Sequence, residues 1–121
     1  MEHTLEVYQN ATLIFHSDGN WLYPLFDLEQ FLAETDVDPA DLVVYDKIVG
    51  RAAALLMIHF GLGRVHAQLL SQLGQEILQY HGVLYTYERR VERIACQTEQ
   101  LLETMYDPAS AYGLLRERAE L

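Results

Sequence analysis

The segment from residue 42 to residue 60, LVVYDKIVGRAAALLMIHF, carries the residues best placed to do chemistry. Its β-branched start is typical of a strand buried on both sides, and its alanine-rich second half predicts a helix enclosed by protein. Asp46 and Lys47 stand where the predicted strand gives way to the helix. Because ligands of α/β proteins bind at the carboxyl ends of strands and the amino ends of helices, this junction is the candidate site.

Four residues of the junction each have a functional and a structural interpretation. Asp46 is a candidate general base, nucleophile or acceptor for a ribose hydroxyl, and its alternative role is a helix cap. Lys47 and Arg51 have the spacing of neighbouring positions on a helix, where they would hold a phosphate or remain surface cations. Gly50 would let a ligand or another backbone come close, or would only relieve packing. We expect all four to contribute to a ligand-binding site.

Cys96 and Glu99 are further candidates from the C-terminal part of the chain. A nearby arginine such as Arg93 would favour the thiolate form of Cys96 and make it a nucleophile, whereas a lone cysteine is more often a buried structural residue. Glu99 is either a partner for the cations of the junction or a solvated residue on a helix. Cys96 is therefore a candidate catalytic residue beside Asp46, and Glu99 is a candidate ligand-binding residue.

The sequence does not predict a metal centre. His16, His59, His66 and His81 fall on different predicted elements, and no pair of them has the i, i+4 spacing of a helical metal site. The single cysteine, Cys96, excludes an intramolecular disulfide and a multi-cysteine metal cluster. We expect no metal ligands and no zinc or other cofactor.

Composition narrows the class of protein. The 121 residues, half of them hydrophobic, match one globular domain. The formal net charge of -10 should repel nucleic acid and anionic membrane surfaces, so neither is an expected partner. The start, MEHTLEVYQN, lacks the basic and apolar regions of a signal peptide, and no apolar stretch is long enough to span a bilayer. We expect a cytoplasmic protein.

Hydrophobic periodicity predicts alternating strands and helices. Strands are predicted at residues 4–8, 12–16, 42–45, 64–71 and 84–89, and helices at 22–34, 52–58 and 71–82, followed by a helical tail over 92–121. The order β-β-α-β-α-β-α-β predicts an α/β, three-layer α-β-α sandwich around a mixed five-stranded sheet. Right-handed crossovers make the last three strands parallel and leave the hairpin at one edge. We expect one domain over 1–121, with its core in 4–89.

The DKIVGRAAALL segment resembles a small bacterial family of uncharacterised proteins whose fold is similar to that of cytidine deaminases. The resemblance extends from residue 42 to residue 99, and Cys96-Gln97-Thr98-Glu99 is similar to the family's Cys-Pro-x-Glu segment with glutamine in place of proline. It implies a cytidine-deaminase-like fold. Zinc deaminases need a His or Cys followed by Glu, and a Pro-Cys-x-x-Cys. Because this chain lacks both motifs, we expect no zinc-dependent deamination.

Three functions remain open. The first is binding of a nucleotide or an ADP-ribose-like ligand, with phosphates held by Lys47, Arg51 and the helix amino terminus. The second is a metal-independent transferase or hydrolase that acts on a nucleoside or ribosyl bond through Asp46, with Cys96 or Glu99. The third is a catalytically silent interaction module. A homodimer is also expected, because the last strand of the sheet would be exposed.

Overall fold

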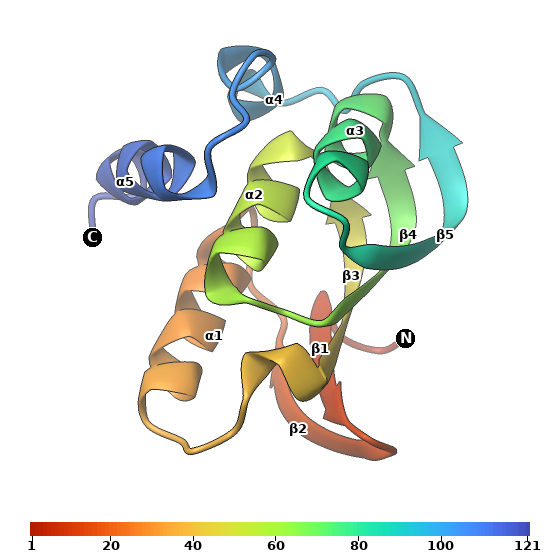
Figure 1. The fold of residues 1–121 in the computed structure, drawn as a ribbon, viewed down its shortest axis with the longest axis vertical. Coiled ribbons are helices and arrows are strands. Elements are labelled where there is room, and N and C mark those ends of the chain that lie inside the picture. The colour runs from red at the N-terminus through yellow and green to blue at the C-terminus, as the bar shows by residue number, and fades with distance from the viewer.

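The computed structural model describes residues 1–121 as alternating strands and helices (Figure 1). The elements are β1 (Leu5–Gln9), β2 (Thr12–Ser17), α1 (Tyr23–Ala33), a short 3-10 helix (Pro39–Asp41), β3 (Leu42–Val49), α2 (Arg51–Phe60), β4 (Arg64–Ser71), α3 (Gln72–Tyr80), β5 (Leu84–Val91), α4 (Gln97–Leu101) and α5 (Pro108–Arg118). The predicted α/β class and the order β-β-α-β-α-β-α-β are confirmed.

The strands form one mixed sheet in the order β2-β1-β3-β4-β5. β1 runs antiparallel to both β2 and β3, whereas β3, β4 and β5 are parallel to one another. The hairpin of β1 and β2 therefore forms one side of the sheet, as predicted. Parallel strands require crossovers, and α2 and α3 supply them.

Helices α1, α2 and α3 pack against the sheet, and α5 packs against α2, so that three layers follow one another (Figure 1). The helix-facing side of the sheet carries fully buried residues such as Val7, Val44 and Val65. On the opposite side Tyr8, Tyr45 and the half-buried His66 form a row of neighbouring rings, with centroids 5.3 Å and 5.2 Å apart. This alternation of buried and more exposed side chains is the normal period of a strand.

Local sequence signals explain where the central elements begin and end. Gly61 ends α2 with a left-handed backbone (φ 81°), which glycine adopts without steric cost. Ser71 begins α3, because its hydroxyl group accepts a hydrogen bond from the N–H of Gly74. Asp107 caps α5 in the same way, through the N–H of Ser110.

The junction between β3 and α2 lies later in the chain than predicted. β3 continues to Val49, because Ile48 and Val49 pair with β4, and α2 begins only at Arg51. Asp46 and Lys47 are therefore strand residues and not the first residues of a helix. Lys47 and Arg51 do not lie on neighbouring helical positions, which corrects the geometry expected from their spacing.

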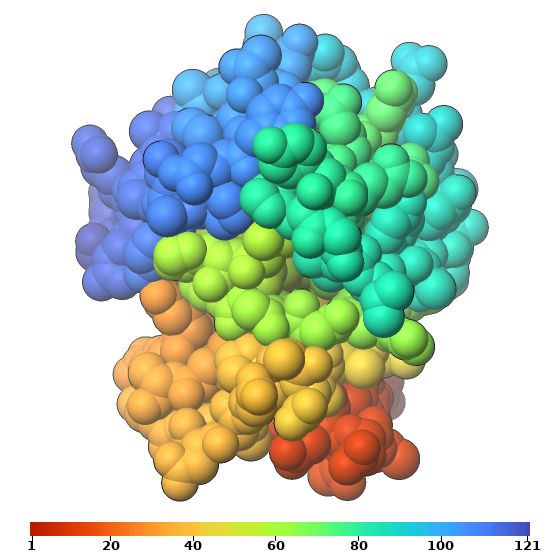
Figure 2. All heavy atoms as spheres, in the orientation of Figure 1, coloured from red at the N-terminus to blue at the C-terminus, as the bar shows by residue number.

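The C-terminal segment belongs to the same hydrophobic core as the sheet. Leu102, Ala111 and Leu115 are fully buried and join the cluster that contains α2. In the space-filling view this segment lies against α2 and α3 (Figure 2). None of the helices combines the length and the apolar character needed to cross a membrane.

Candidate functional site

A cavity of about 610 Å³ lies where the carboxyl ends of β3, β4 and β5 meet the start of α2. Residues before α1 and the segment after β5 complete its wall. This is the place at which open α/β sheets usually bind ligands. Five of the six predicted site residues line the cavity: Asp46, Lys47, Gly50, Cys96 and Glu99.

Asp46 reaches the cavity from β3, and only 8% of its surface is exposed. Burial raises the pKa of its carboxyl group from 3.8 to about 7, because the ionised form loses its hydration. Hydrogen bonds from the backbone N–H groups of Ile48 and Lys47 oppose this rise. A carboxyl group with a pKa near neutrality can both donate and accept a proton, so Asp46 has the property of a general acid or base.

Glu99 caps the amino end of α2, a role the sequence favoured for Asp46. Its side chain is buried, and Oε2 accepts a hydrogen bond from the backbone N–H of Arg51 at 2.6 Å. This contact satisfies an N–H group that has no acceptor within the helix, and the negative charge complements the helix dipole. The other oxygen, Oε1, is buried without a hydrogen-bond partner. Such an atom is costly when left unpaired, so Oε1 is an acceptor that no group of the protein uses.

Gly50 allows the Glu99 carboxylate to come this close. A Cβ atom at position 50 would lie 2.7 Å from Glu99 Oε2 and would overlap the Cδ1 atom of Ile94. The groups that a Cβ atom at this position would meet are therefore the side chains of Ile94 and Glu99, and not a ligand or another backbone segment. Lys47, a residue of β3, lines the same cavity and is exposed to solvent.

Arg51, the sixth predicted site residue, does not line the cavity. Its side chain is completely buried, and its Nε and Nη2 atoms donate to the backbone oxygen of Met105 at 3.0 Å and 2.7 Å. Its Nη1 atom donates to the backbone oxygen of Leu73 and to Glu76 Oε1, at 3.1 Å and 2.8 Å. Arg51 therefore joins α2 to α3 and to the C-terminal segment, and its charge is not available for a phosphate in the cavity.

Cys96 lies at the cavity, half-buried, immediately before α4. Its Sγ atom is 2.8 Å from the hydroxyl oxygen of Thr98. Arg93, the cation expected to favour the thiolate, pairs instead with Glu103 at 3.2 Å. Cys96 therefore lines the cavity, but Arg93 does not contact its thiol group.

Trp21 is a cavity residue that sequence reasoning missed. It lies just before α1, lines the cavity and is 39% exposed. Its backbone is left-handed (φ 57°), a conformation that is rare for a bulky residue and that marks functional sites or tight turns. The turn signal SDGN directly before Trp21 is visible in the sequence. Trp21 is far from Asp46 along the chain, however, so the sequence gave no reason to place both residues in one site.

The raised pKa of Asp46 predicts that the protein loses stability as the pH rises. The folded state binds this proton more tightly than the unfolded state, whose carboxyl group titrates at the ordinary 3.8. The contribution is fully present below about pH 4 and is lost as the pH rises through 7, a change of up to about 4 kcal/mol. Asp46→Asn is neutral at every pH, so its stability relative to the wild type should increase between pH 4 and pH 8.

Urea unfolding at several pH values checks this expectation. The exposed Asp41 provides a matched control, because Asp41→Asn removes a carboxylate that is hydrated in both states. If Asp46→Asn and Asp41→Asn follow the wild-type pH profile equally, the carboxyl group of Asp46 does not carry the expected penalty.

Comparisons with known proteins support the fold. A family model described as a domain of unknown function (DUF1893) matches residues 2–119. The chain is similar to the crystal structure of a DUF1893 family protein (TM1506) from Thermotoga maritima, with a TM-score of 0.85 and 22% sequence identity. That similarity covers 95% of this chain and 80% of the other, and at this identity it shows the fold alone. No curated protein matches the chain.

Proposed function

We propose that this chain, which belongs to the DUF1893 family of domains of unknown function, binds a nucleoside or nucleotide in the cavity beside Asp46. The observation that carries the proposal is Glu99 Oε1, a buried acceptor without a partner in the wall of that cavity. An acceptor of this kind fits a ligand with an N–H or O–H donor, which nucleobases and riboses supply.

The cavity also offers partners for the rest of a nucleobase. Ala52 and Ala53 line it at the first turn of α2, where backbone N–H groups have no acceptor within the helix. A base edge that carries a donor next to an acceptor would bind Glu99 Oε1 and these N–H groups together. The indole ring of Trp21 lies in the same wall and provides an aromatic surface for stacking.

Phosphates of a nucleotide would lie at the rim of the cavity. The Glu99 carboxylate already occupies the amino end of α2, and it would repel a phosphate there. Lys47 and Arg93 line the cavity and are both exposed, so they are the cations that phosphates can reach, and Arg93 would exchange its surface partner Glu103 for a phosphate. In this proposal Lys47 keeps its predicted role as a phosphate-binding residue, and Arg93 takes the role that the sequence suggested for Arg51. ADP-ribose, which joins a base, riboses and phosphates, remains within this ligand class.

Fluorescence and calorimetry test the proposal. Trp21 is the only tryptophan, so binding of cytidine, adenosine, their phosphates or ADP-ribose should change its emission. We expect Lys47→Ala to weaken binding of nucleotides by about tenfold, the loss of one charge-assisted contact, and to leave nucleosides unaffected. Arg90→Ala is the matched control, because Arg90 is exposed on β5 and binds Gln75 outside the cavity.

The result against the proposal would be no binding of any of these compounds at millimolar concentration. That outcome would favour the third function, a catalytically silent interaction module. Binding that Lys47→Ala and Arg90→Ala weaken equally would place the phosphates outside the cavity.

A metal-independent enzyme is the second candidate, and the pKa of Asp46 near 7 favours it. Residues lining the cavity include one cysteine and no histidine, a donor set that does not fit the zinc site of a deaminase. Asp46 would instead move a proton to or from a ribosyl or base atom of the bound ligand. Product analysis by mass spectrometry should then show turnover that Asp46→Asn abolishes while binding persists.

A further inference from the structure

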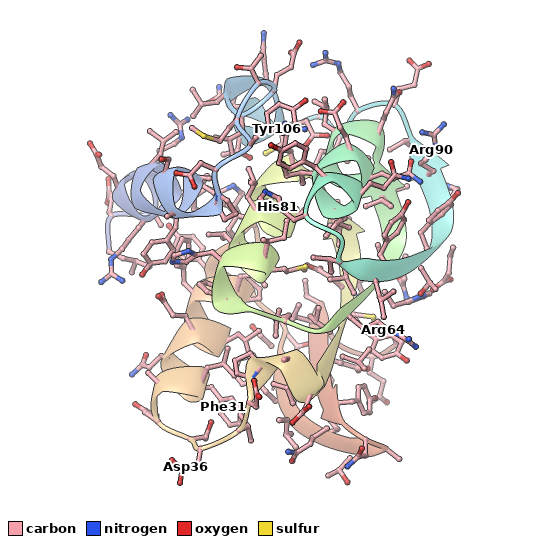
Figure 3. The ribbon with its side chains drawn as sticks, in the orientation of Figure 1. Phe31, Asp36, Arg64, His81, Arg90 and Tyr106 are labelled. Carbon is pink, nitrogen blue, oxygen red and sulfur yellow. The ribbon has the colours of Figure 1, made fainter.

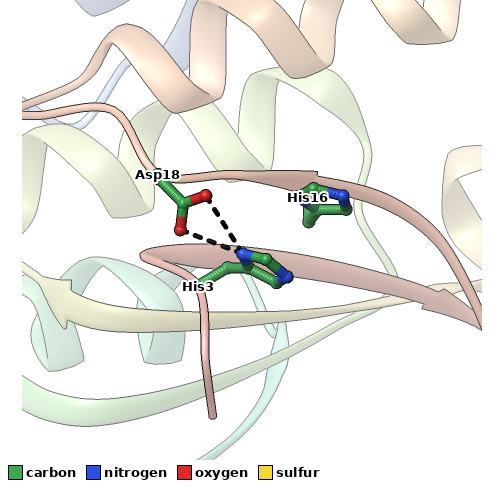
Figure 4. A group of neighbouring side chains, drawn as sticks. All are labelled: His3, His16 and Asp18. Carbon is green, nitrogen blue, oxygen red and sulfur yellow. Dashed lines mark hydrogen bonds and ion pairs between the residues drawn. The ribbon is translucent and has the colours of Figure 1, made fainter.

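Two histidines and an aspartate meet at the open end of the β1–β2 hairpin, outside the cavity (Figure 4). His3 precedes β1, His16 lies near the end of β2, and Asp18 follows β2 directly. One nitrogen or oxygen atom from each residue can be chosen so that all three lie within 4.8 Å of one another. His3 and Asp18 are 15 residues apart, and the hairpin brings them together.

His3 is the central residue of the cluster, because it contacts both Asp18 and His16. His3 Nδ1 lies 2.9 Å and 3.2 Å from the two carboxylate oxygens of Asp18 (Figure 4). The ring of His16 stacks on the ring of His3, with centroids 3.9 Å apart and planes inclined by 18°. In a tetrahedral zinc site, neighbouring ligand atoms are roughly 3.3 Å apart. The His3–Asp18 separations are close to this value, whereas the three ligand atoms together span up to 4.8 Å, so His16 must move closer to complete the site.

We propose that His3, His16 and Asp18 bind a divalent transition-metal ion of the zinc class. Imidazole nitrogens favour zinc, cobalt, nickel and copper, whereas magnesium and calcium prefer oxygen ligands. Two histidines and one carboxylate leave at least one coordination position for water. The formal net charge of -10 favours the approach of any cation to this chain.

Binding requires one side chain to rotate. An ion lies in the plane of each imidazole that binds it, and two nearly parallel rings cannot share such an ion. His16 is exposed and its ring makes no hydrogen bond within the protein, so it can turn toward His3 and Asp18 without losing one. The position of His3 is restrained from the other side, because its backbone N–H donates to Glu6 Oε2 at 3.3 Å.

The ion would join the segment before β1 to the end of β2. Thr4 and Gly19, the neighbours of His3 and Asp18 in the chain, both line the cavity described above. A bound metal would thus hold one part of the cavity wall in place. The metal site does not depend on the proposed nucleotide, and either can fail alone.

Titration of metal-free protein with Co²⁺ at neutral pH, followed by competition with Zn²⁺, tests the site. We expect a visible absorption band from a single bound cobalt ion, and at least about tenfold weaker binding in His16→Ala and in Asp18→Asn. His66→Ala is the matched control, since His66 also lies on the sheet surface next to a carboxylate, Glu88, at 3.1 Å. Melting temperatures measured without metal show that each variant is folded.

Four results would overturn the proposal, and the first three concern affinity. They are Co²⁺ binding weaker than about 1 mM, equal binding by the wild type and the His16 and Asp18 variants, and an equal loss in His66→Ala. A near-ultraviolet band from cobalt–thiolate coordination would place the ion at Cys96 and would also contradict it.

Discussion

Arg51→Ala is expected to destabilise the protein by about 3–5 kcal/mol. The substitution removes a completely buried side chain and the hydrogen bonds that it donates to the backbone oxygens of Met105 and Leu73. It also removes the guanidinium group from the face of Tyr106, whose ring centre lies 4.6 Å away. The loss is large because these contacts join α2, α3 and the segment that leads to α5.

Tyr106 takes part in the same contacts between α2, α3 and the C-terminal segment (Figure 3). Its hydroxyl group donates to Glu76 Oε1 at 2.9 Å, and its backbone oxygen lies 2.7 Å from His81 Nε2. Hydrogen bonds from Arg51 and Tyr106 lower the pKa of Glu76. Because the side chain of Glu76 is 47% exposed, we assign the stability to the buried hydrogen bonds of Arg51 and not to the Arg51–Glu76 ion pair.

Urea unfolding of Arg51→Ala, Arg51→Lys and Arg64→Ala measures the effect. Lysine keeps the charge but cannot bond to several acceptors in the planar arrangement of a guanidinium group, so Arg51→Lys should also be clearly destabilised. Arg64 is exposed on β4 (Figure 3), and its substitution should change stability by no more than about 0.5 kcal/mol. Similar stabilities for the Arg51 and Arg64 alanine variants would contradict the structural role of Arg51.

Gly50→Ala is expected to destabilise the protein by about 1–3 kcal/mol and to abolish the nucleotide binding proposed above. The backbone of Gly50 is extended, so the cause is not its conformation. The added Cβ would collide with Ile94 and with the carboxylate of Glu99, and it would push Glu99 away from the N–H of Arg51. The helix would lose its cap, and the cavity would lose the wall formed by residues 94–99.

Gly113→Ala is the matched control for this substitution. Gly113 is exposed in α5, and an added Cβ meets no atom within 4 Å. Because alanine favours the helix over glycine, this variant should gain about 0.5–1 kcal/mol. Thermal unfolding compares the stabilities of the two variants, and calorimetric titration with the nucleotides tested above compares their binding. A stable Gly50→Ala protein that binds nucleotide normally would show that the Glu99 contact is dispensable.

Local patterns were sufficient to predict most of the fold. Hydrophobic periodicity predicts the strands and helices, and chemistry within a few residues explains why helices begin at Ser71 and Asp107 and why α2 ends at Gly61. The sheet topology followed from the order of the elements and the handedness of crossovers. The position of the cavity followed from this topology, because the carboxyl ends of parallel strands lie at the same end of the sheet.

The length of β3 shows where local patterns fail. The charged pair after Tyr45 indicated the end of a strand, yet pairing of Ile48 and Val49 with β4 extends β3 past it. This pairing joins residues that are distant in the chain, and no short window of sequence contains it. The error in the boundary also produced the expectation that Lys47 and Arg51 share a helical face.

The sequence by itself determined the α/β class, the order of the elements and the end of the sheet at which the cavity lies, because periodicity, capping and crossover handedness depend on short segments. Only the tertiary structure decided that Arg51 is buried against Met105, that Glu99 caps α2 with one oxygen unpaired, and that His3 meets Asp18. Each of these contacts joins residues far apart in the chain. The direction of a polar side chain is set by whichever donor or acceptor the packing brings within reach, and residue type does not specify that partner.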